Sequence, residues 1–317
     1  MFCQIILIMK KKYKISVIVP YFNEQKKIIK TLNNLKKQTY KNFDVILINS
    51  NSSDNSFNIV NKWINNNRRK NKIQFKNYNK KTFYPSTSKN AGIKSTKNDW
   101  VAFMDCDLKF SKNWLQDQVE YLKKNKTMYV MGLCHFTGYD MMDKIYVSQT
   151  WGYNSKIAVI PSSIFHKSLF KKIGYFQETR AGYDKIWKQN LKKKDNGLKI
   201  NSKCLIKYEK YNHANNYENF LKKIFRYSIS SFKVKNNNQP KIYFLFFILF
   251  IIISSKSFYY FISISLFYLF VRSYFYPIFK SKTLNLNFSS IIFLPIVGLS
   301  IDIVRFFAYC LCLIRLK

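Results

Sequence analysis

Two aspartates that follow an apolar run are the first residues in this chain that could do chemistry. In the stretch DWVAFMDCDLKF, apolar residues 101–104 lead directly into Asp105 and Asp107. Carboxylates spaced one residue apart at a strand end can turn toward one ligand, and Mg²⁺ and Mn²⁺ prefer one or two carboxylates together with phosphate oxygens. The simpler alternative is a solvated loop or a helix cap, because D-x-D alone is a weak pattern.

The segments that must position these aspartates alternate between strand and helix patterns. Apolar runs predict strands at residues 14–22, 43–50, 72–78 and 100–105. Between them, helical spacing of apolar residues predicts helices at 23–39 and 53–67, and a short helix is expected at 88–96. This alternation predicts an α/β fold with a mostly parallel sheet flanked by helices. Such sheets bind ligands at the carboxyl ends of their strands.

The chain is strongly basic. Its 54 Lys and Arg residues outnumber 16 Asp and Glu residues, which gives a formal net charge of +38. A charge of this size could indicate nucleic-acid binding. The lysines, however, are spread over the whole chain and form no single basic arm. We therefore expect no nucleic-acid partner, and we expect phosphate-bearing ligands and anionic lipid headgroups to be favoured. The six cysteines contain no C-x-x-C pair, so no zinc site is predicted.

Composition changes sharply near residue 241. Residues 242–271 are apolar apart from Lys256, and the second apolar segment, 288–314, carries only Asp302 and Arg305. A bilayer-spanning helix needs ~20 apolar residues. The second segment meets this length, and the first allows either one tilted span or a tight hairpin with Lys256 at the turn.

These segments predict three parts of the chain. We expect a catalytic domain at 1–225, a basic interfacial helix and linker at 226–241, and a membrane region of two to three hydrophobic helices at 242–317. Basic residues flank both apolar segments. The simplest topology keeps most of them on the cytoplasmic face, so we expect the cell (inner) membrane, with the catalytic domain in the cytoplasm.

Four blocks of the sequence, taken in order, resemble the inverting family 2 glycosyltransferases, which have a GT-A fold. The blocks are KISVIVPYFNEQKKIIKTLNNLKKQTYKNFDVILINSNSSDNS, SKNAGIKSTKNDWVAFMDCD, FKKIGYFQETRAGYDKIW and YEKYNHANNYENFLKKIFRYS. They cover about residues 13 to 230. The apolar tail is also similar to that of many bacterial members that act on lipid-linked or surface glycans.

The resemblance implies a role for each matching residue. The nucleotide pocket would be lined by Pro20, Tyr21, Asn23 and Glu24, with Asn49 and Ser50 near the base and ribose, and Lys89 and Asn90 facing the diphosphate or ribose. Asp105 would contact the ribose or the metal, Asp107 would be the main metal ligand, Asp184 the general base, and His213 a further metal or diphosphate contact.

Simpler roles and departures from the family stand beside this assignment. Glu24 would also suit the first turn of a helix, Asp184 a helix cap and His213 a packed loop. The family usually has an acidic residue where this chain has Asn49, and commonly a Glu where it has Tyr183.

The resemblance implies an enzyme that needs Mg²⁺ or Mn²⁺ and moves a sugar from a nucleotide-diphosphate sugar to a hydroxyl. The acceptor would be a lipid-linked or cell-surface glycan. A charged leaving group requires a metal or cations, and a poorly nucleophilic hydroxyl requires a base. The alternatives are a polyprenyl-phosphate glycosyl synthase, in which a lipid phosphate attacks, and a non-catalytic basic membrane protein.

Overall fold

A computed structural model describes residues 13–68, 72–82, 84–138, 140–208, 216–232, 238–281 and 288–314. His213 lies outside the described residues. Within them the chain forms two compact units. The first comprises residues 13–135 and 156–208, and the second comprises 136–155 and 216–314. The sequence does not single out 136–155, and the predicted boundaries at 225 and 241 stay a prediction.

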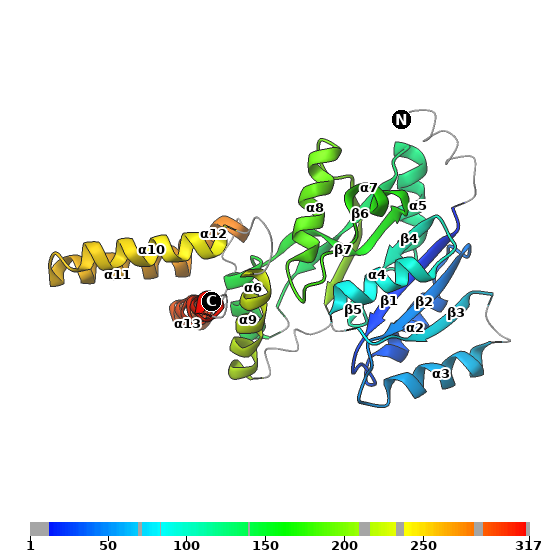
Figure 1. Ribbon diagram of the computed structural model, residues 1–317, viewed down its shortest axis with the longest axis horizontal. Helices are drawn as coiled ribbons and strands as arrows, with labels where there is room; N and C mark the ends of the chain where they lie inside the picture. The colour runs from blue at the N-terminus through cyan, green and yellow to red at the C-terminus, as the bar shows by residue number, and fades with distance from the viewer. Residues whose placement is uncertain are drawn as a thin grey trace. The chain divides into compact units, whose positions relative to one another are not determined.

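The first unit is an eight-stranded sheet with helices packed against it (Figure 1). Its strands are β1 (Ile15–Tyr21), β2 (Phe43–Asn49), β3 (Gln74–Asn79), β4 (Trp100–Phe103), β5 (Leu108–Lys109), β6 (Tyr129–Phe136), β7 (Ser155–His166) and β8 (Ile200–Tyr208). Its helices are α2 (Ile28–Lys36), α3 (Ser56–Asn67), α4 (Pro85–Ser95), α5 (Trp114–Asn125), α7 (Ser168–Ile173) and α8 (Tyr183–Lys194). The strands and helices predicted from the alternation are all present.

The strand order is β3-β2-β1-β4-β7-β6-β8-β5. The four strands from β3 to β4 are parallel, whereas β7 runs antiparallel to β4. The register pairs Tyr21 with Asn49 and Ile18 with Phe103. The carboxyl ends of β1, β2 and β4 therefore meet at one edge of the sheet. From β1, the chain adds β2 and β3 on one side and then β4 on the other side, so the strand order changes direction at β1. Open α/β sheets bind ligands at such a point.

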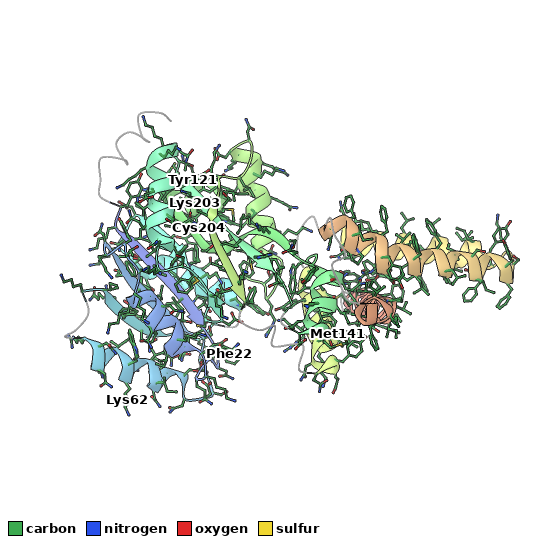
Figure 2. The ribbon with its side chains drawn as sticks, turned by 180° about the vertical axis from the view of Figure 1, so that it is seen from behind. Phe22, Lys62, Tyr121, Met141, Lys203 and Cys204 are labelled. Carbon is green, nitrogen blue, oxygen red and sulfur yellow. The ribbon has the colours of Figure 1, made fainter. Side chains whose placement is uncertain are left out.

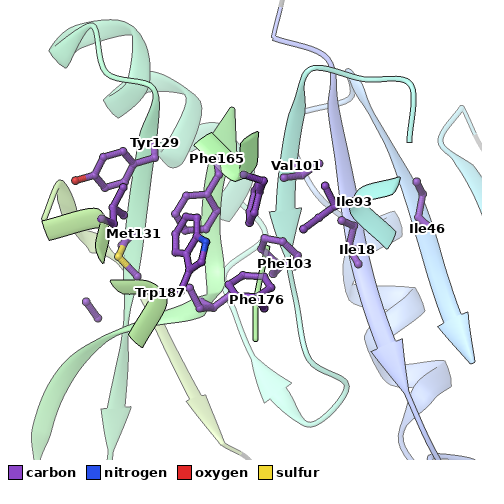
Figure 3. Close-up of a cluster of buried hydrophobic side chains, with 14 of the residues drawn as sticks. Ile18, Ile46, Ile93, Val101, Phe103, Tyr129, Met131, Phe165, Phe176 and Trp187 are labelled. Carbon is purple, nitrogen blue, oxygen red and sulfur yellow. The ribbon is translucent and has the colours of Figure 1, made fainter. Parts of the chain in front are cut away.

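One buried hydrophobic cluster of the first unit joins the sheet to α4, α7 and α8 (Figure 3). Phe103 at the end of β4 packs edge-on against Phe176 and against Phe170, with ring centroids 5.6 and 6.2 Å away. Trp187 of α8 contacts Phe165 of β7 at 5.0 Å. These aromatic contacts hold α8 against the strand that carries the two aspartates, because burial of large rings contributes most to such a core.

The second unit is helical. It contains α6 (Met141–Thr150), α9 (Tyr217–Phe232), α10 (Gln239–Ser254), α11 (Phe258–Phe270), the π-helical turn η1 (Val271–Phe275), α12 (Tyr276–Ser281) and α13 (Phe288–Ile314). α6 and α9 pack on α13 through a cluster that includes Tyr146, Phe220 and Leu294. Two helical stretches, Phe258–Lys280 and Ile291–Ile314, are long and apolar enough to cross a membrane, by length and composition alone.

The first apolar segment forms a hairpin rather than a single tilted span. α10 and α11 are separated by a three-residue turn that contains Lys256. Ring contacts pair Phe250 with Phe261 and Phe246 with Tyr268, so the two helices run antiparallel. The described helices of this segment thus have a hairpin arrangement with Lys256 at the turn, and how the segment meets a membrane stays a prediction.

Candidate active site

Two loops close one side of the strand-end edge. Asn23 follows β1 with φ 54°, a left-handed conformation that Asn tolerates. Its side-chain carbonyl accepts the Ser53 N–H at 2.9 Å, and the Ser56 hydroxyl accepts the Glu24 N–H at 2.8 Å. The loop after β1 is thus fastened to the loop after β2, which fixes the entry to α2.

The residues at the tips of β1 and β2 are largely occupied in holding the backbone. Asn49 is buried; its amide nitrogen donates to Asn79 at 3.0 Å and its carbonyl accepts from the Ser52 N–H and hydroxyl. The Tyr21 hydroxyl donates to Asn77 at 2.8 Å inside the unit. Because the polar groups of Tyr21 and Asn49 already have hydrogen-bond partners within the protein, we interpret both side chains as supports of the strand ends rather than as ligand contacts.

Other groups at this edge remain closer to the surface. The Ser50 hydroxyl lies 2.7 Å from the Ser88 hydroxyl of α4, and the Pro20 carbonyl accepts from the Cys106 thiol at 3.7 Å. Phe22, directly after β1, exposes 54% of its surface (Figure 2). An exposed ring beside polar strand ends can stack on a planar ligand group, and its position after Pro20-Tyr21 is a signal that the sequence analysis passed over.

The two aspartates after β4 have different partners. Asp105 accepts a hydrogen bond from the Lys89 ammonium at 2.8 Å, and the Lys89 side chain is only 1% exposed. Asp107 lies 3.8 Å from the Lys27 ammonium, beyond hydrogen-bond distance. The Thr31 hydroxyl of α2 donates to the Cys106 carbonyl between them. Asp105 is therefore held by a buried cation, while the ion pair between Asp107 and the partly exposed Lys27 is looser.

Lys89 also reaches the start of α8. Its ammonium lies 5.9 Å from the ring centroid of Tyr183, the first residue of that helix. Asp184 follows in the first helical turn, with 39% of its side chain exposed and its carboxylate 3.8 Å from the Lys188 ammonium. Gly182 precedes the helix with φ 81°, which favours glycine. Lys89 thus links the aspartate-bearing end of β4 to the helix that carries Asp184.

α4 holds the segment that leads to α8. The Asn90 side chain donates to the Phe176 carbonyl at 2.8 Å and accepts the Phe176 N–H at 3.1 Å. Ser86 makes the same reciprocal pair with Thr179, at 2.8 and 3.1 Å. With both amide atoms engaged and 6% exposure, Asn90 positions this segment rather than facing an open surface.

Carboxylates crowd the strand-end edge. Burial raises the pKa of Glu24 to about 7; Lys27 opposes this, and the charges of Asp107, Asp105 and Asp54 add to it. Burial alone would lower the pKa of Lys89, but Asp105 and Tyr183 hold it above its ordinary value. Burial also raises the pKa of Tyr183 to about 12. The edge therefore carries repelling carboxylates that a bound cation would relieve.

The donor set at this edge fits a divalent cation that shares a phosphate ligand. No group of three or more His, Cys, Asp or Glu side chains is placed to hold a metal among the residues that the structure describes. Asp105 and Asp107 together supply the one or two carboxylates that Mg²⁺ and Mn²⁺ take when a substrate phosphate and water complete the shell.

The structure gathers most of the residues singled out in the sequence onto one unit. Pro20, Tyr21, Asn23, Glu24, Asn49 and Ser50 lie at the ends of β1 and β2, Lys89 and Asn90 on α4, Asp105 and Asp107 after β4, and Asp184 on α8. The sequence reasoning missed the anchoring roles of Ser86 and Tyr183. The partner of Ser86, Thr179, is 93 residues away in the chain. The role of Tyr183 is visible only from its contact with Lys89.

Comparisons with known proteins agree with this arrangement. The model of the family described as Glycosyl transferase family 2 matches residues 16–188. The chain is 28% identical over 158 residues to poly(ribitol-phosphate) beta-N-acetylglucosaminyltransferase TarP of Staphylococcus aureus, covering 49% of this chain and 41% of TarP. It is 31% identical over 116 residues to an uncharacterized glycosyltransferase of Rickettsia bellii, covering 37% of this chain and 16% of that protein. The chain thus spans less than two thirds of these relatives.

A solved structure shares the fold. The mannosyltransferase PcManGT from Pyrobaculum calidifontis, in complex with GDP-Man and Mn²⁺, superimposes with a TM-score of 0.50 at 16% identity. The match covers 73% of this chain and 68% of PcManGT. The sheet and its helices therefore have the GT-A arrangement that the sequence predicts.

Proposed function

Because the chain belongs to glycosyl transferase family 2, we propose that it is an inverting, metal-dependent enzyme that moves a sugar from a nucleotide-diphosphate sugar to a hydroxyl. The observation that carries this proposal is the Lys89 bridge between Asp105 and the start of α8. It puts a candidate metal or ribose contact, Asp105, and a candidate base, Asp184, on directly linked elements.

The donor would bind at the carboxyl ends of β1, β2 and β4. Pro20, Asn23, Glu24 and Ser50 form the rim of this edge, and Tyr21 and Asn49 support it from below. We assign the exposed ring of Phe22 to contact with the nucleotide base. Lys89 and Asn90 act as positioning residues in this scheme, because both are buried and already bonded to protein groups.

Asp107 and Asp105 would hold Mg²⁺ or Mn²⁺, with His213 as a further candidate from the sequence. When bound, this ion neutralises charge that develops on the departing diphosphate. Lys89 orients Asp105, since its buried ammonium donates a hydrogen bond to that carboxylate at 2.8 Å.

Asp184 would remove the proton of the acceptor hydroxyl. Its carboxylate is partly exposed at the start of α8, so an acceptor could reach it. The hydroxyl oxygen then attacks the anomeric carbon, the bond from that carbon to the diphosphate oxygen breaks, and the configuration inverts. General-base catalysis of this kind contributes typically 10²–10⁴-fold.

The acceptor in this proposal is a lipid-linked or cell-surface glycan. TarP is a poly(ribitol-phosphate) beta-N-acetylglucosaminyltransferase, and this similarity makes a glycan polymer of the cell surface the first acceptor class to test. The apolar helices at 242–317 would anchor the enzyme in the cell (inner) membrane with the catalytic domain in the cytoplasm, and 226–241 would form the linker. Their length and apolar composition support this placement.

Nucleotide binding by the detergent-solubilised full chain tests the site. UDP, GDP and dTDP would be titrated with and without Mn²⁺ into wild type and Asp107→Asn, with Asp99→Asn as a matched control that precedes β4. We expect metal-dependent binding of one nucleotide that Asp107→Asn loses and Asp99→Asn keeps. Absence of nucleotide binding by folded protein would refute the proposal.

A kinetic test addresses the base. Asp184→Asn should lower kcat by 10²–10⁴-fold with a small change in KM for the donor, because proton removal is lost while binding is kept. Nearly full activity in Asp184→Asn would favour a phosphate acceptor, which needs no base.

A further inference from the structure

Two lysines of the first unit form ion pairs with the aspartates after β4, and they are held with different firmness. The Lys89 side chain is 1% exposed, and its ammonium donates to Asp105 at 2.8 Å. The Lys27 side chain is 29% exposed, and its ammonium lies 3.8 Å from Asp107, beyond hydrogen-bond distance. Lys89 cannot turn toward a ligand without giving up its bond to Asp105 in a buried site. Of these two cations, Lys27 is therefore the one that can change partners.

The backbone of Lys27 is held in place by hydrogen bonds. The Lys27 and Ile28 N–H groups both donate to the Glu24 carbonyl, each at 2.9 Å. The Thr31 hydroxyl of α2 donates to the Cys106 carbonyl, which fastens this helix to the loop between the two aspartates. A lysine on a fixed backbone can still move its ammonium, because its four-carbon stem is flexible. A change of partner by Lys27 thus requires no movement of α2.

The position of Lys27 is unfavourable for the helix that it begins. Lys27 is the N-cap of α2, and its side chain makes no capping hydrogen bond. Helix N-caps favour Ser, Thr, Asp and Asn, and the positive end of the helix dipole repels a cation. Lys36 lies in the last turn of α2, where the dipole favours a cation. Helix stability therefore does not account for a cation at Lys27, whereas attraction to the carboxylates of Glu24 and Asp107 does.

A divalent cation at Asp107 would change the surroundings of Lys27. Mg²⁺ binds its oxygens at about 2.0–2.1 Å, so two oxygens that share one ion lie ~3–4 Å apart. A donor phosphate oxygen on the same ion as Asp107 would therefore lie near that carboxylate, as the Lys27 ammonium does at 3.8 Å. The ion repels the ammonium, whereas the negative diphosphate attracts it. Charge thus favours a shift of the Lys27 ammonium from the carboxylate to the diphosphate.

We propose that Lys27 is a contact for the donor diphosphate, and that its ammonium exchanges Asp107 for the diphosphate when a divalent cation binds to Asp107. This inference rests on the proposed function, in which the nucleotide-diphosphate sugar binds at this edge. It gives Lys27 the diphosphate contact that the family resemblance implies for Lys89, because Lys89 is already bonded to Asp105. In the metal-free chain Lys27 offsets the charges of Asp107 and Glu24, and in the donor complex it offsets the charge of the leaving group.

Calorimetric titration of the detergent-solubilised full chain tests the diphosphate contact with three variants. Lys27→Met removes the charge, Lys27→Arg keeps it, and Lys26→Met removes the charge of the exposed neighbouring lysine. UDP, GDP and dTDP would each be titrated in saturating Mn²⁺. Lys27→Met should weaken binding of the nucleotide that the wild type prefers about tenfold, because one charge-assisted contact is lost. Lys27→Arg should retain most of the affinity, since a guanidinium also binds phosphate, and Lys26→Met should bind like the wild type.

The affinity for Mn²⁺ alone should change in the opposite direction. Lys27 competes with the metal for Asp107, so Lys27→Met should bind Mn²⁺ about threefold more tightly than the wild type, the size expected for a partly exposed ion pair. A general loss of structure would instead weaken the binding of both metal and nucleotide. Equal or weaker Mn²⁺ binding by Lys27→Met would overturn the exchange, and nucleotide binding equal to that of the wild type would overturn the contact.

Inorganic pyrophosphate with Mn²⁺ separates this inference from the proposed function, because it offers a diphosphate without a base or a sugar. Nucleotide binding that is lost in Asp107→Asn but unchanged in Lys27→Met overturns the role of Lys27 and leaves the transferase proposal standing. Absence of nucleotide binding by the folded wild type refutes the transferase proposal. Pyrophosphate binding that still weakens in Lys27→Met would then support a metal and diphosphate site of another function, and pyrophosphate binding that does not weaken would overturn this inference as well.

Discussion

Each unit of this protein contains a cluster of charged side chains, and the two clusters differ in composition and in exposure. At the strand-end edge of the first unit, Glu24, Asp105 and Asp107 face the cations of Lys27 and Lys89. In the second unit, two guanidiniums share the single carboxylate of Asp302.

The first cluster contains mainly carboxylates and the second mainly guanidiniums, so the two clusters are stabilised in different ways. Burial raises the pKa of Glu24, Lys27 opposes this, and the nearby carboxylates add to it. A cation bound at this edge would reduce the carboxylate repulsion, which fits a divalent metal. In the second unit the two guanidiniums share the Asp302 carboxylate, and Arg305 also donates to the Tyr243 hydroxyl at 3.1 Å. Protein groups therefore supply the partners of this cluster that the structure describes.

The largest expected effect comes from breaking the balanced pair in the first unit. Asp105→Asn leaves the Lys89 ammonium fully buried beside neutral groups, and removing one partner of a buried pair costs about 3–5 kcal/mol. Lys89→Met should cost less, because the orphaned Asp105 carboxylate is 29% exposed and can be hydrated. Thermal unfolding in detergent measures both, at roughly 2–4 °C per kcal/mol.

The double variant Lys89→Met/Asp105→Asn is the control for this pair. It removes both charges and should recover most of the stability lost in Asp105→Asn, since a charge-free pair carries no desolvation cost. If the double variant unfolds at the same temperature as Asp105→Asn, Lys89 is not a buried cation that depends on Asp105.

A middle-sized effect is expected in the second unit, where one cation is in excess. Arg272→Gln loses the 2.5 Å ion pair with Asp302 and the bond to Gln149, at an expected cost of about 2 kcal/mol. Arg305→Gln removes the more distant guanidinium and leaves a neutral pair, so its effect should be less than about 1 kcal/mol. Thermal unfolding followed at Trp151, which stacks on Phe136 in this unit, measures both.

The reverse ranking would contradict the charge count. If Arg305→Gln destabilises more than Arg272→Gln, the contact of Arg305 with Asp302 and the Tyr243 hydroxyl is the stronger support of this cluster.

Local patterns in the sequence were sufficient to predict the strands and the hairpin. Alternating apolar runs predict the first four strands, and because parallel strands end at a common edge, the residues after β1, β2 and β4 are predicted to meet. Lys256 is the single charge in a 30-residue apolar segment, so the turn of the α10–α11 hairpin is also visible in the sequence.

Contacts between distant residues could not be predicted in this way. Lys89 and Asp105 are 16 residues apart, and Gln149 and Arg272 are 123 apart. Such pairs form because packing brings α4 to β4 and α6 to η1, and no local periodicity encodes either event. The position of β7 beside β4 and the grouping of 136–155 with the second unit were missed for the same reason.

The residues to which the family resemblance gives a role fall into two groups, which differ in exposure and hydrogen bonding. Asp105, Asp107 and Asp184 have side chains that remain partly exposed, so a ligand can reach them. Asn49 and Asn90 carry polar groups that the fold itself uses. A motif gives the residue type and its place in the chain, but only the surrounding hydrogen bonds distinguish a ligand contact from a positioning residue.

The smallest expected effect is a pH dependence at the carboxylate-rich edge. The pKa of Glu24 is about 7 in the folded chain, raised by burial from an ordinary value of 4.5. Between about pH 4.5 and 7 the folded state keeps a proton that the unfolded state has released, so the free energy of unfolding falls as the pH rises. Glu24→Gln removes this slope and should be more stable than wild type at pH 8 by about 1 kcal/mol, after allowance for partial exposure.

The difference in unfolding free energy between wild type and Glu24→Gln isolates the titration of Glu24 from that of other groups. Adding Mn²⁺ tests whether a cation at this edge changes that difference. A cation at Asp107 would offset the repulsion at Glu24 and lower its pKa, so saturating Mn²⁺ with nucleotide should shrink the pH 5 to pH 8 difference. Arg305→Gln, which alters the other cluster, should leave that difference unchanged. A slope that persists at saturating metal would mean that burial alone, rather than neighbouring carboxylates, holds the Glu24 proton, and that the edge has no cation-binding excess.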